Sequence, residues 1–87
     1  MGSEPLGDVL ARALQSFGEL TSLPVESVSR VERAEDGWQV NFEVLELERV
    51  PRLSDLLASY EVDVDPSGNL RAFRRLRRYL RKQQEDA

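Results

Sequence analysis

The stretch WQVNFEVLELERVPRLSDLLASYEVDVD, residues 38–65, decides the fold that this sequence predicts. It contains two runs in which apolar and polar side chains alternate, one that begins at Trp38 and one that covers residues 58–64. Alternation with a period of two is typical of half-buried β-strands. Pro51 lies between the runs and ends the first, because proline lacks the N–H group that a strand ladder requires. Residues 53–57 are expected to form one helical turn before the second strand.

The apolar side chains of the first run change face partway along it. Those that share the first face are Trp38, Val40, Phe42 and Val44. Leu45 and Leu47 continue in the opposite phase. Either a β-bulge lies near Val44 and Leu45, or the far end of this strand is covered on its other side. Trp38, the single tryptophan, is expected to be a core residue beside a turn, with a partner anchor as the alternative.

Residues 6–22, LGDVLARALQSFGELTS, predict an amphipathic helix. Apolar side chains recur there every three or four residues and form one stripe. The stripe consists of Leu6, Val9, Leu10, Ala13, Leu14, Phe17 and Leu20. Pro24 prevents the helix from continuing far beyond this point. We expect the stripe to cover one face of the sheet rather than to bind a partner, because a small sheet needs a covered face.

Residues 25–34, VESVSRVERA, predict a weaker strand that forms a hairpin with the run from Trp38. Asp36-Gly37 lies between the two, and this dipeptide favours a tight turn because both residues accept positive φ angles. Matching apolar with apolar side chains gives a register in which Val31 faces Phe42 and Val28 faces Leu45.

Residues 65–69, DPSGN, predict the turn of a second hairpin, since proline presets φ and Gly68 supplies a left-handed position. The resulting register pairs Val64 with Leu70, Val62 with Ala72, Tyr60 with Arg74 and Asp63 with Arg71. The stretch after the turn, LRAFRRLRRYLRK, is expected to be a strand to about residue 77, followed by a turn or a frayed helix. Residues 81–87 are expected to be a disordered tail.

These elements predict a single α+β domain over residues 1–87. An N-terminal amphipathic helix packs on a small antiparallel sheet of three to four strands within residues 25–80, and a short C-terminal helix is a further option. The exposed edges of such a sheet make a homodimer plausible.

The composition argues against an enzyme. The 87 residues include no histidine and no cysteine, which removes the commonest general base, a thiolate nucleophile and sulfur-ligated zinc. The carboxylate pairs Glu43/Glu46 and Glu61/Asp63 are expected to form the solvated face of strands, because nothing near them would separate their pKa values. We therefore expect no catalytic residue, no metal and no cofactor.

The segment from Asp63 to Gly68 imitates the opening of a calcium-binding loop, but Arg74 stands at the twelfth position, where a bidentate glutamate is required. We expect a plain hairpin turn instead. No apolar run approaches the ~20 residues of a membrane span, and no signal-peptide pattern opens the sequence. These features predict a protein without membrane contact.

Charge is distributed unevenly along the chain. The net charge is −4, yet residues 1–70 carry five basic and fourteen acidic side chains, whereas residues 71–82 carry seven basic and no acidic ones. We call this second segment the arginine ribbon. Its charged members are Arg71, Arg74, Arg75, Arg77, Arg78, Arg81 and Lys82, interleaved with Phe73 and Tyr79. Three uses stay open: internal pairing with the acidic strands, docking onto an acidic protein, and nucleic-acid binding, which the negative charge of the whole chain disfavours.

Five short motifs follow one another along residues 31–81. They are EDGW at 35–38, EVLELERVP at 43–51, DLLASYEVDVD at 55–65, Gly-x-Leu at 68–70, and aromatic-Arg-Arg-x-Arg-Arg-Tyr at 73–79. In this order and spacing they resemble the gas vesicle protein GvpO family. The resemblance implies a small cytoplasmic accessory protein of gas vesicle formation that acts through contacts with other accessory or shell proteins. Association with the gas vesicles themselves is a further expectation from the resemblance.

The resemblance carries over no catalytic residues. The positions that match recurring ones of the family, and that we take as fold or interface candidates, are Trp38, Glu46, Arg49, Pro51, Tyr60 and Glu61, with Arg75, Arg78 and Tyr79 in the ribbon. The candidates for partner binding are Arg71, Arg74, Arg75, Arg77, Arg78, Tyr79 and Arg81.

Overall fold

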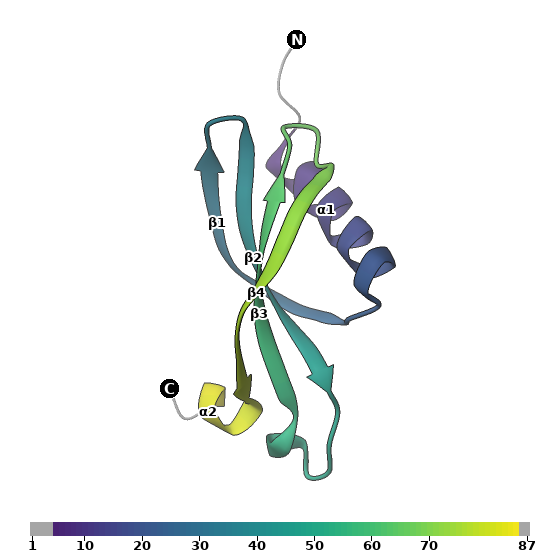
Figure 1. Cartoon of the computed structure of the whole chain (residues 1–87), viewed down its shortest axis with the longest axis vertical. Coiled ribbons are helices and arrows are strands. Elements are labelled where there is room, and N and C mark those ends of the chain that lie inside the picture. Colours follow the sequence, from purple (N-terminus) through teal and green to yellow (C-terminus); the bar gives the residue numbers. More distant parts are fainter. Residues whose placement is uncertain (1–4, 86–87) are drawn as a thin grey trace.

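The computed structural model describes residues 5–85, which form a helix on one face of a four-stranded antiparallel sheet. The elements are α1 (Leu6–Thr21), β1 (Val25–Ala34), β2 (Gly37–Leu47), a 3₁₀ turn η1 (Arg52–Ser54), β3 (Leu56–Val64), β4 (Leu70–Leu80) and α2 (Arg81–Glu85). The strands lie in chain order, β1-β2-β3-β4, so β1 and β4 are the two edges. Figure 1 shows α1 on one side of the twisted sheet and α2 towards the opposite end. The predicted α+β fold is confirmed.

The core lies between α1 and the face of the sheet that the alternating pattern predicted to be apolar. Val9, Ala13 and Phe17 of α1 are fully buried there. They pack against Val40, Phe42, Val44, Ala58, Val62 and Val64 of the two central strands. The Phe17 ring meets the rings of Phe42, Tyr60 and Phe73 edge-on, with centroids 5.3, 5.4 and 5.5 Å away. Within residues 5–85, no long helix lies on the other face of the sheet, which we call the open face.

The first hairpin is present, but the predicted register is wrong by two residues near the turn. The turn is formed by residues 35–36, and Gly37, at φ +130°, is already the first residue of β2. Val31 therefore faces Val40, two residues from its predicted partner Phe42. Near the turn this shift of two residues keeps every side chain on the same face, so the hydrophobic pattern could not distinguish the two registers. A bulge at Ser29 adds a third residue to the shift, so Val28 faces Phe42 instead of Leu45.

The second hairpin keeps only the first of its predicted pairs, Val64 with Leu70. Arg71 and Leu76 are bulged out of the pairing between β3 and β4, and each bulge advances β4 by one residue. Asp63 pairs with Ala72 instead of Arg71, and Val62 pairs with Phe73 instead of Ala72. Tyr60 pairs with Arg75 instead of Arg74.

The change of phase in β2 at Leu45 does not come from a bulge. Leu45 pairs with Leu57 in the same register as Val44 with Ala58, so both leucines lie on the face opposite α1, where Leu57 is 1% exposed. A bulge at Glu46 follows, and Leu47 pairs with Leu56. The helical turn expected at 53–57 is the shorter η1, and β3 begins at Leu56 instead of residue 58.

The C-terminal segment is more ordered than the sequence predicted. β4 continues to Leu80, three residues beyond the expected end of the strand. Residues 81–85 form α2, so the option of a short C-terminal helix is confirmed and the disordered tail expected there is wrong. The reason is the burial of Arg81, described below, which fixes the start of this helix. Residues 86–87, the end of that predicted tail, lie outside the described residues.

Candidate protein-interaction surface

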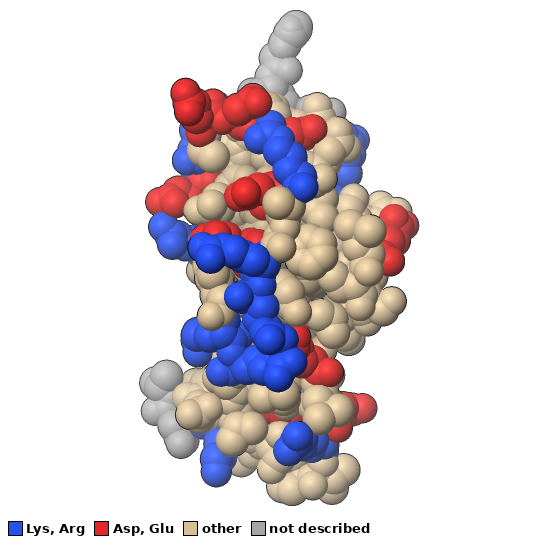
Figure 2. Space-filling model, viewed as in Figure 1, with Lys and Arg blue, Asp and Glu red and all other residues tan. Residues whose placement is uncertain are grey.

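The arginine ribbon lies mainly on β4, the exposed edge strand. Residues 71–78 of this strand are all exposed, and Figure 2 shows a band of basic side chains along the middle of the face, where β4 runs in Figure 1. Alternation along the strand divides the arginines between the two faces of the sheet. Arg75 and Arg78 lie on the same face as α1, since they pair with Tyr60 and Ala58.

On that face, the Glu46 carboxylate contacts both of these arginines and a tyrosine. Its carboxylate accepts hydrogen bonds from Arg78 Nε at 2.7 Å and from the Tyr60 hydroxyl at 2.9 Å, and Arg75 Nη1 lies 3.5 Å away. Burial acts to raise the pKa of the Glu46 carboxyl, but the Tyr60 hydroxyl and the Arg78 guanidinium outweigh it and hold the pKa below its ordinary value. Four residues singled out in the sequence therefore form one cluster at the β2 bulge.

Arg71 and Arg74 form looser pairs. Arg71 Nη2 lies 3.1 Å from the Asp36 carboxylate in the first hairpin turn, and Arg74 Nε lies 3.0 Å from the Glu61 carboxylate on β3. The Arg74 side chain keeps 72% of its surface exposed. Exposed ion pairs of this kind contribute only ~0–1 kcal/mol, so both arginines can exchange their carboxylate for one on another molecule.

Arg81 differs from the rest of the ribbon, because its side chain is 5% exposed. Its guanidinium donates two hydrogen bonds to Glu26 and a third, at 3.0 Å, to Asp55, and its backbone N–H donates to the Asp55 carbonyl oxygen. Hydrogen bonds from the backbone of Arg49 and from Arg81 hold the pKa of Asp55 below its ordinary value. These contacts give Arg81 the geometry of an anchor for α2, and the sequence pattern did not reveal its two partners.

A buried carboxylate on the open face was missed by the sequence analysis. Glu43 was expected on the solvated side of its strand, but it is 7% exposed. Three hydroxyl groups donate to it: Ser29 Oγ at 2.5 Å, Ser59 Oγ at 2.5 Å and the Tyr79 hydroxyl at 2.6 Å. Burial alone would raise the pKa of the Glu43 carboxyl, but these donors and the charge of Arg77 hold it below its ordinary value.

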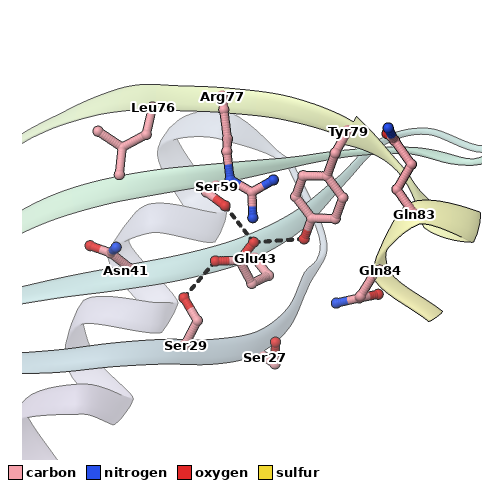
Figure 3. A pocket seen from close by; sticks show the side chains of 10 residues that line it. All are labelled: Ser27, Ser29, Asn41, Glu43, Ser59, Leu76, Arg77, Tyr79, Gln83 and Gln84. Carbon is pink, nitrogen blue, oxygen red and sulfur yellow. Dashed lines mark hydrogen bonds between the residues drawn. The ribbon is translucent and has the colours of Figure 1, made fainter. Parts of the chain in front are cut away.

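Tyr79 is therefore placed by Glu43, and burial together with this hydrogen bond raises its pKa. The Arg77 guanidinium lies over the Tyr79 ring, 4.4 Å from its centroid. Figure 3 shows Arg77 and the three hydroxyl donors, Ser29, Ser59 and Tyr79, converging around Glu43. This arrangement is a polar site with one buried anion and one exposed cation.

The remaining candidates are dispersed. Trp38 is half-buried beside the first turn, packs against the core and has Arg33 over its ring at 5.3 Å. Arg49 and Pro51 are exposed in the connection between β2 and β3, and the Arg49 backbone N–H donates to Asp55. Glu61 is the partner of Arg74 on β3.

The turn that imitates a calcium loop uses its acidic group internally. Asp65 accepts hydrogen bonds from the backbone N–H groups of Ser67 and Asn69, both at 2.9 Å, and from the Asn69 side chain. Within residues 5–85 no group of three or more acidic side chains is arranged to hold a metal ion. None of the helices in the described part of the chain is long and apolar enough to cross a membrane.

Comparison with known proteins places almost the whole chain in one family. The family model described as gas vesicle synthesis protein GvpO matches residues 3–85. Gas vesicle protein O of Streptomyces sp. (strain CB03234) is 56% identical over 73 residues, which are 84% of this chain and 57% of that protein. Gas vesicle protein O of Haloferax mediterranei is 32% identical over 77 residues, 87% of this chain and 55% of that protein.

A third relative, gas vesicle protein O1 of Halobacterium salinarum, is 29% identical over 76 residues, 87% of this chain and 64% of that protein. The chain thus spans between about half and two thirds of the length of the curated relatives that it matches. No solved structure matches it.

Proposed function

Because the chain belongs to the gas vesicle synthesis protein GvpO family, we propose that it serves gas vesicle formation as a non-enzymatic assembly protein. In this proposal the sheet and the arginine ribbon dock onto acidic surfaces of other gas vesicle accessory or shell proteins. The proposed location is the cytoplasm, at forming vesicles.

The observation that carries this proposal is that four arginines of β4 are exposed and at the same time paired with a carboxylate. Arg71, Arg74, Arg75 and Arg78 keep between 42% and 72% of their side-chain surface exposed while each already lies against a carboxylate. Such arginines are ordered before binding, so less side-chain entropy is lost when a partner carboxylate joins or replaces the internal one. Planar guanidinium groups also bind carboxylates through two parallel hydrogen bonds.

The carboxylates on the sheet support a binding role over an acid–base role. Glu43 and Glu46 both have lowered pKa values, so both are ionised at neutral pH and neither is prepared to act as a general acid. The same carboxylates lie directly behind the arginines, where they would repel the phosphates of a nucleic acid. We therefore favour a protein partner over the nucleic-acid alternative.

The proposal is tested by co-expressing the tagged chain with other gas vesicle accessory and shell proteins, one at a time, and measuring which ones co-purify. The informative variant is Arg71→Glu with Arg74→Glu, because both side chains are exposed and their reversal leaves the core intact. The matched control is Arg30→Glu with Arg33→Glu, which makes the same charge change on the other edge, β1. We expect the β4 variant to lose the partner and the β1 variant to retain it.

Retention of every partner by a folded β4 variant would overturn the role of the ribbon. A second pair of substitutions, Arg75→Gln with Arg78→Gln, removes the two arginines on the face that carries α1. Loss of the partner in this variant would show that this face of the sheet, and not the open face alone, takes part in binding. Gel retardation with RNA and DNA at low salt tests the alternative, since binding through phosphates is strongest there. We expect no retardation.

A further inference from the structure

A concave polar site lies on the open face of the sheet, opposite α1. It encloses about 540 Å³, within the roughly 300–1,000 Å³ range typical of ligand sites. All four strands and α2 contribute to its walls, and Figure 3 shows their side chains directed into it. Its floor is the Glu43 cluster, and its single cation is Arg77.

Arg77 is held in place without being neutralised by direct contact. The Glu43 carboxylate fixes the Tyr79 hydroxyl, and the Tyr79 ring supports the face of the guanidinium at 4.4 Å. Stacking uses the flat face of the group and leaves the N–H edge for hydrogen bonds. Among the described side chains, no carboxylate forms a salt bridge with Arg77, in contrast to the four other arginines of β4.

The rest of the wall consists mainly of uncharged groups that hydrogen-bond well to peptide bonds. Asn41, Gln83 and Gln84 contribute side-chain amides, and Ser27 contributes a hydroxyl. Gln83 uses its oxygen to accept the Leu80 backbone N–H at 2.8 Å, which leaves its NH₂ group as a donor. Amide and hydroxyl groups around one cation match a short peptide segment with one negative side chain.

The charge of the site limits the ligand further. Glu43 already accepts three hydrogen bonds and retains its negative charge below the cavity, so Arg77 and Glu43 together are close to neutral. A doubly charged phosphate group would be repelled by Glu43, whereas a single carboxylate can form a two-point pair with the Arg77 edge.

We propose that this cavity, the Arg77 pocket, binds an aspartate or glutamate side chain of an extended segment on the partner protein. Arg77 binds the carboxylate, and the amides of β2 and α2 bind the neighbouring peptide groups. Glu43 and Tyr79 are positioning residues that hold the guanidinium. This inference rests on the proposed docking function and names the chemistry of the point of contact.

The test titrates the isotope-labelled chain with a capped Gly-Glu-Gly peptide and follows side-chain signals by NMR. We expect saturable shifts of the Arg77 Nε–H and of the Gln83 and Gln84 amide signals. A capped Gly-Gln-Gly peptide and inorganic phosphate should each bind at least about tenfold more weakly, because they lack the single carboxylate that pairs with Arg77. Equal binding of the glutamine peptide, or tighter binding of phosphate, would overturn the assignment.

Arg77→Gln should weaken binding of the glutamate peptide by about tenfold or more, whereas Arg74→Gln, the same change on the same strand, should leave it within about twofold. Unchanged affinity in folded Arg77→Gln would reject the proposal. If this variant is unfolded, Arg77→Lys replaces it, since lysine keeps the charge and loses the two-point geometry. A lysine variant that binds as tightly as the native chain would then reject it.

Partner capture separates this inference from the function on which it rests. If Arg77→Gln still captures its vesicle partner and Arg71→Glu with Arg74→Glu does not, the ribbon docks the partner but the Arg77 pocket is not the contact. If the peptide binds as expected and no gas vesicle protein is captured, the binding of a carboxylate by the Arg77 pocket is supported. The proposal that gas vesicle proteins are the partners is then rejected.

Discussion

Tyr79→Phe measures how much the Glu43 cluster contributes to stability, because it removes one hydroxyl and leaves the ring that supports Arg77. The deleted group donates to Glu43 Oε1 at 2.6 Å, where the glutamate is 7% exposed and water cannot easily take its place. A hydrogen bond to a charged group contributes about 1.5–3 kcal/mol. Ser29 and Ser59 still donate in the variant, so we expect the lower part of this range, about 1.5–2 kcal/mol at neutral pH.

A loss of this size should be visible in both urea and thermal unfolding followed by circular dichroism. For a chain of this length it corresponds to a decrease of roughly 6–16 °C in the unfolding midpoint. The hydroxyl also helps to lower the pKa of Glu43, so its contribution requires the ionised carboxylate. The difference between native chain and variant should therefore shrink as the pH falls below about 4.5, the ordinary pKa of this group.

Tyr60→Phe is the matched control. It removes a hydroxyl that donates to Glu46 at 2.9 Å, but Arg78 continues to donate to the same carboxylate at 2.7 Å. We expect a loss of less than about 1 kcal/mol, since the site is more exposed and the charge stays paired. A loss below about 0.5 kcal/mol for Tyr79→Phe, or one that does not change with pH, would refute the idea that Glu43 is a buried, ionised acceptor.

Three further outcomes follow from the same structure. Phe17→Ala should cost about 3–5 kcal/mol in urea unfolding, because the ring is fully buried among three other aromatic rings. Gly37→Ala should cost about 2–3 kcal/mol, since φ is +130° and a Cβ atom would lie 2.0 Å from a β3 carbonyl oxygen. The unfolding free energy, measured across pH, should fall on both sides of a neutral plateau. Below about 4.5 it should fall because Glu43 and Glu46, whose pKa values are lowered in the folded chain, become protonated. Above about 10 it should fall because the unfolded chain releases the Tyr79 proton that the folded chain retains.

The period of the hydrophobic pattern was enough to predict which faces are buried. Val40, Phe42 and Val44 on β2 alternate with polar residues, and the stripe of α1 has helical spacing, so both patterns select a single face. The same information does not set the strand register, because pairings that differ by two residues bury identical side chains. Both hairpins were predicted correctly as hairpins and incorrectly in most of their pairs.

The Glu43 site escaped the sequence analysis because bulges, which the period of the hydrophobic pattern does not reveal, each shift the register by one residue. In the predicted register of the second hairpin, Tyr79 would lie opposite Asp55, beyond the end of β3. The bulges at Arg71 and Leu76 advance β4 by two residues and place Tyr79 opposite Leu57, where its hydroxyl reaches Glu43. A third bulge, on β1, leaves Ser29 outside the pairing, and its hydroxyl bonds to the same carboxylate. None of these bulged residues is a glycine, so no local signal in the sequence marks the bulges.

Bulged residues also make most of the polar contacts that define the candidate surface. Glu26 binds Arg81, Glu46 binds Arg78, and Arg71 binds Asp36. Because β1 and β4 each carry two bulges, neither edge offers the regular row of N–H and C=O groups that another strand needs, which disfavours a homodimer formed by edge pairing. Specific recognition by this sheet must then rely on side chains. The arginines of β4 are exposed and ordered by neighbouring side chains, and Arg77 among them is directed into the cavity on the open face.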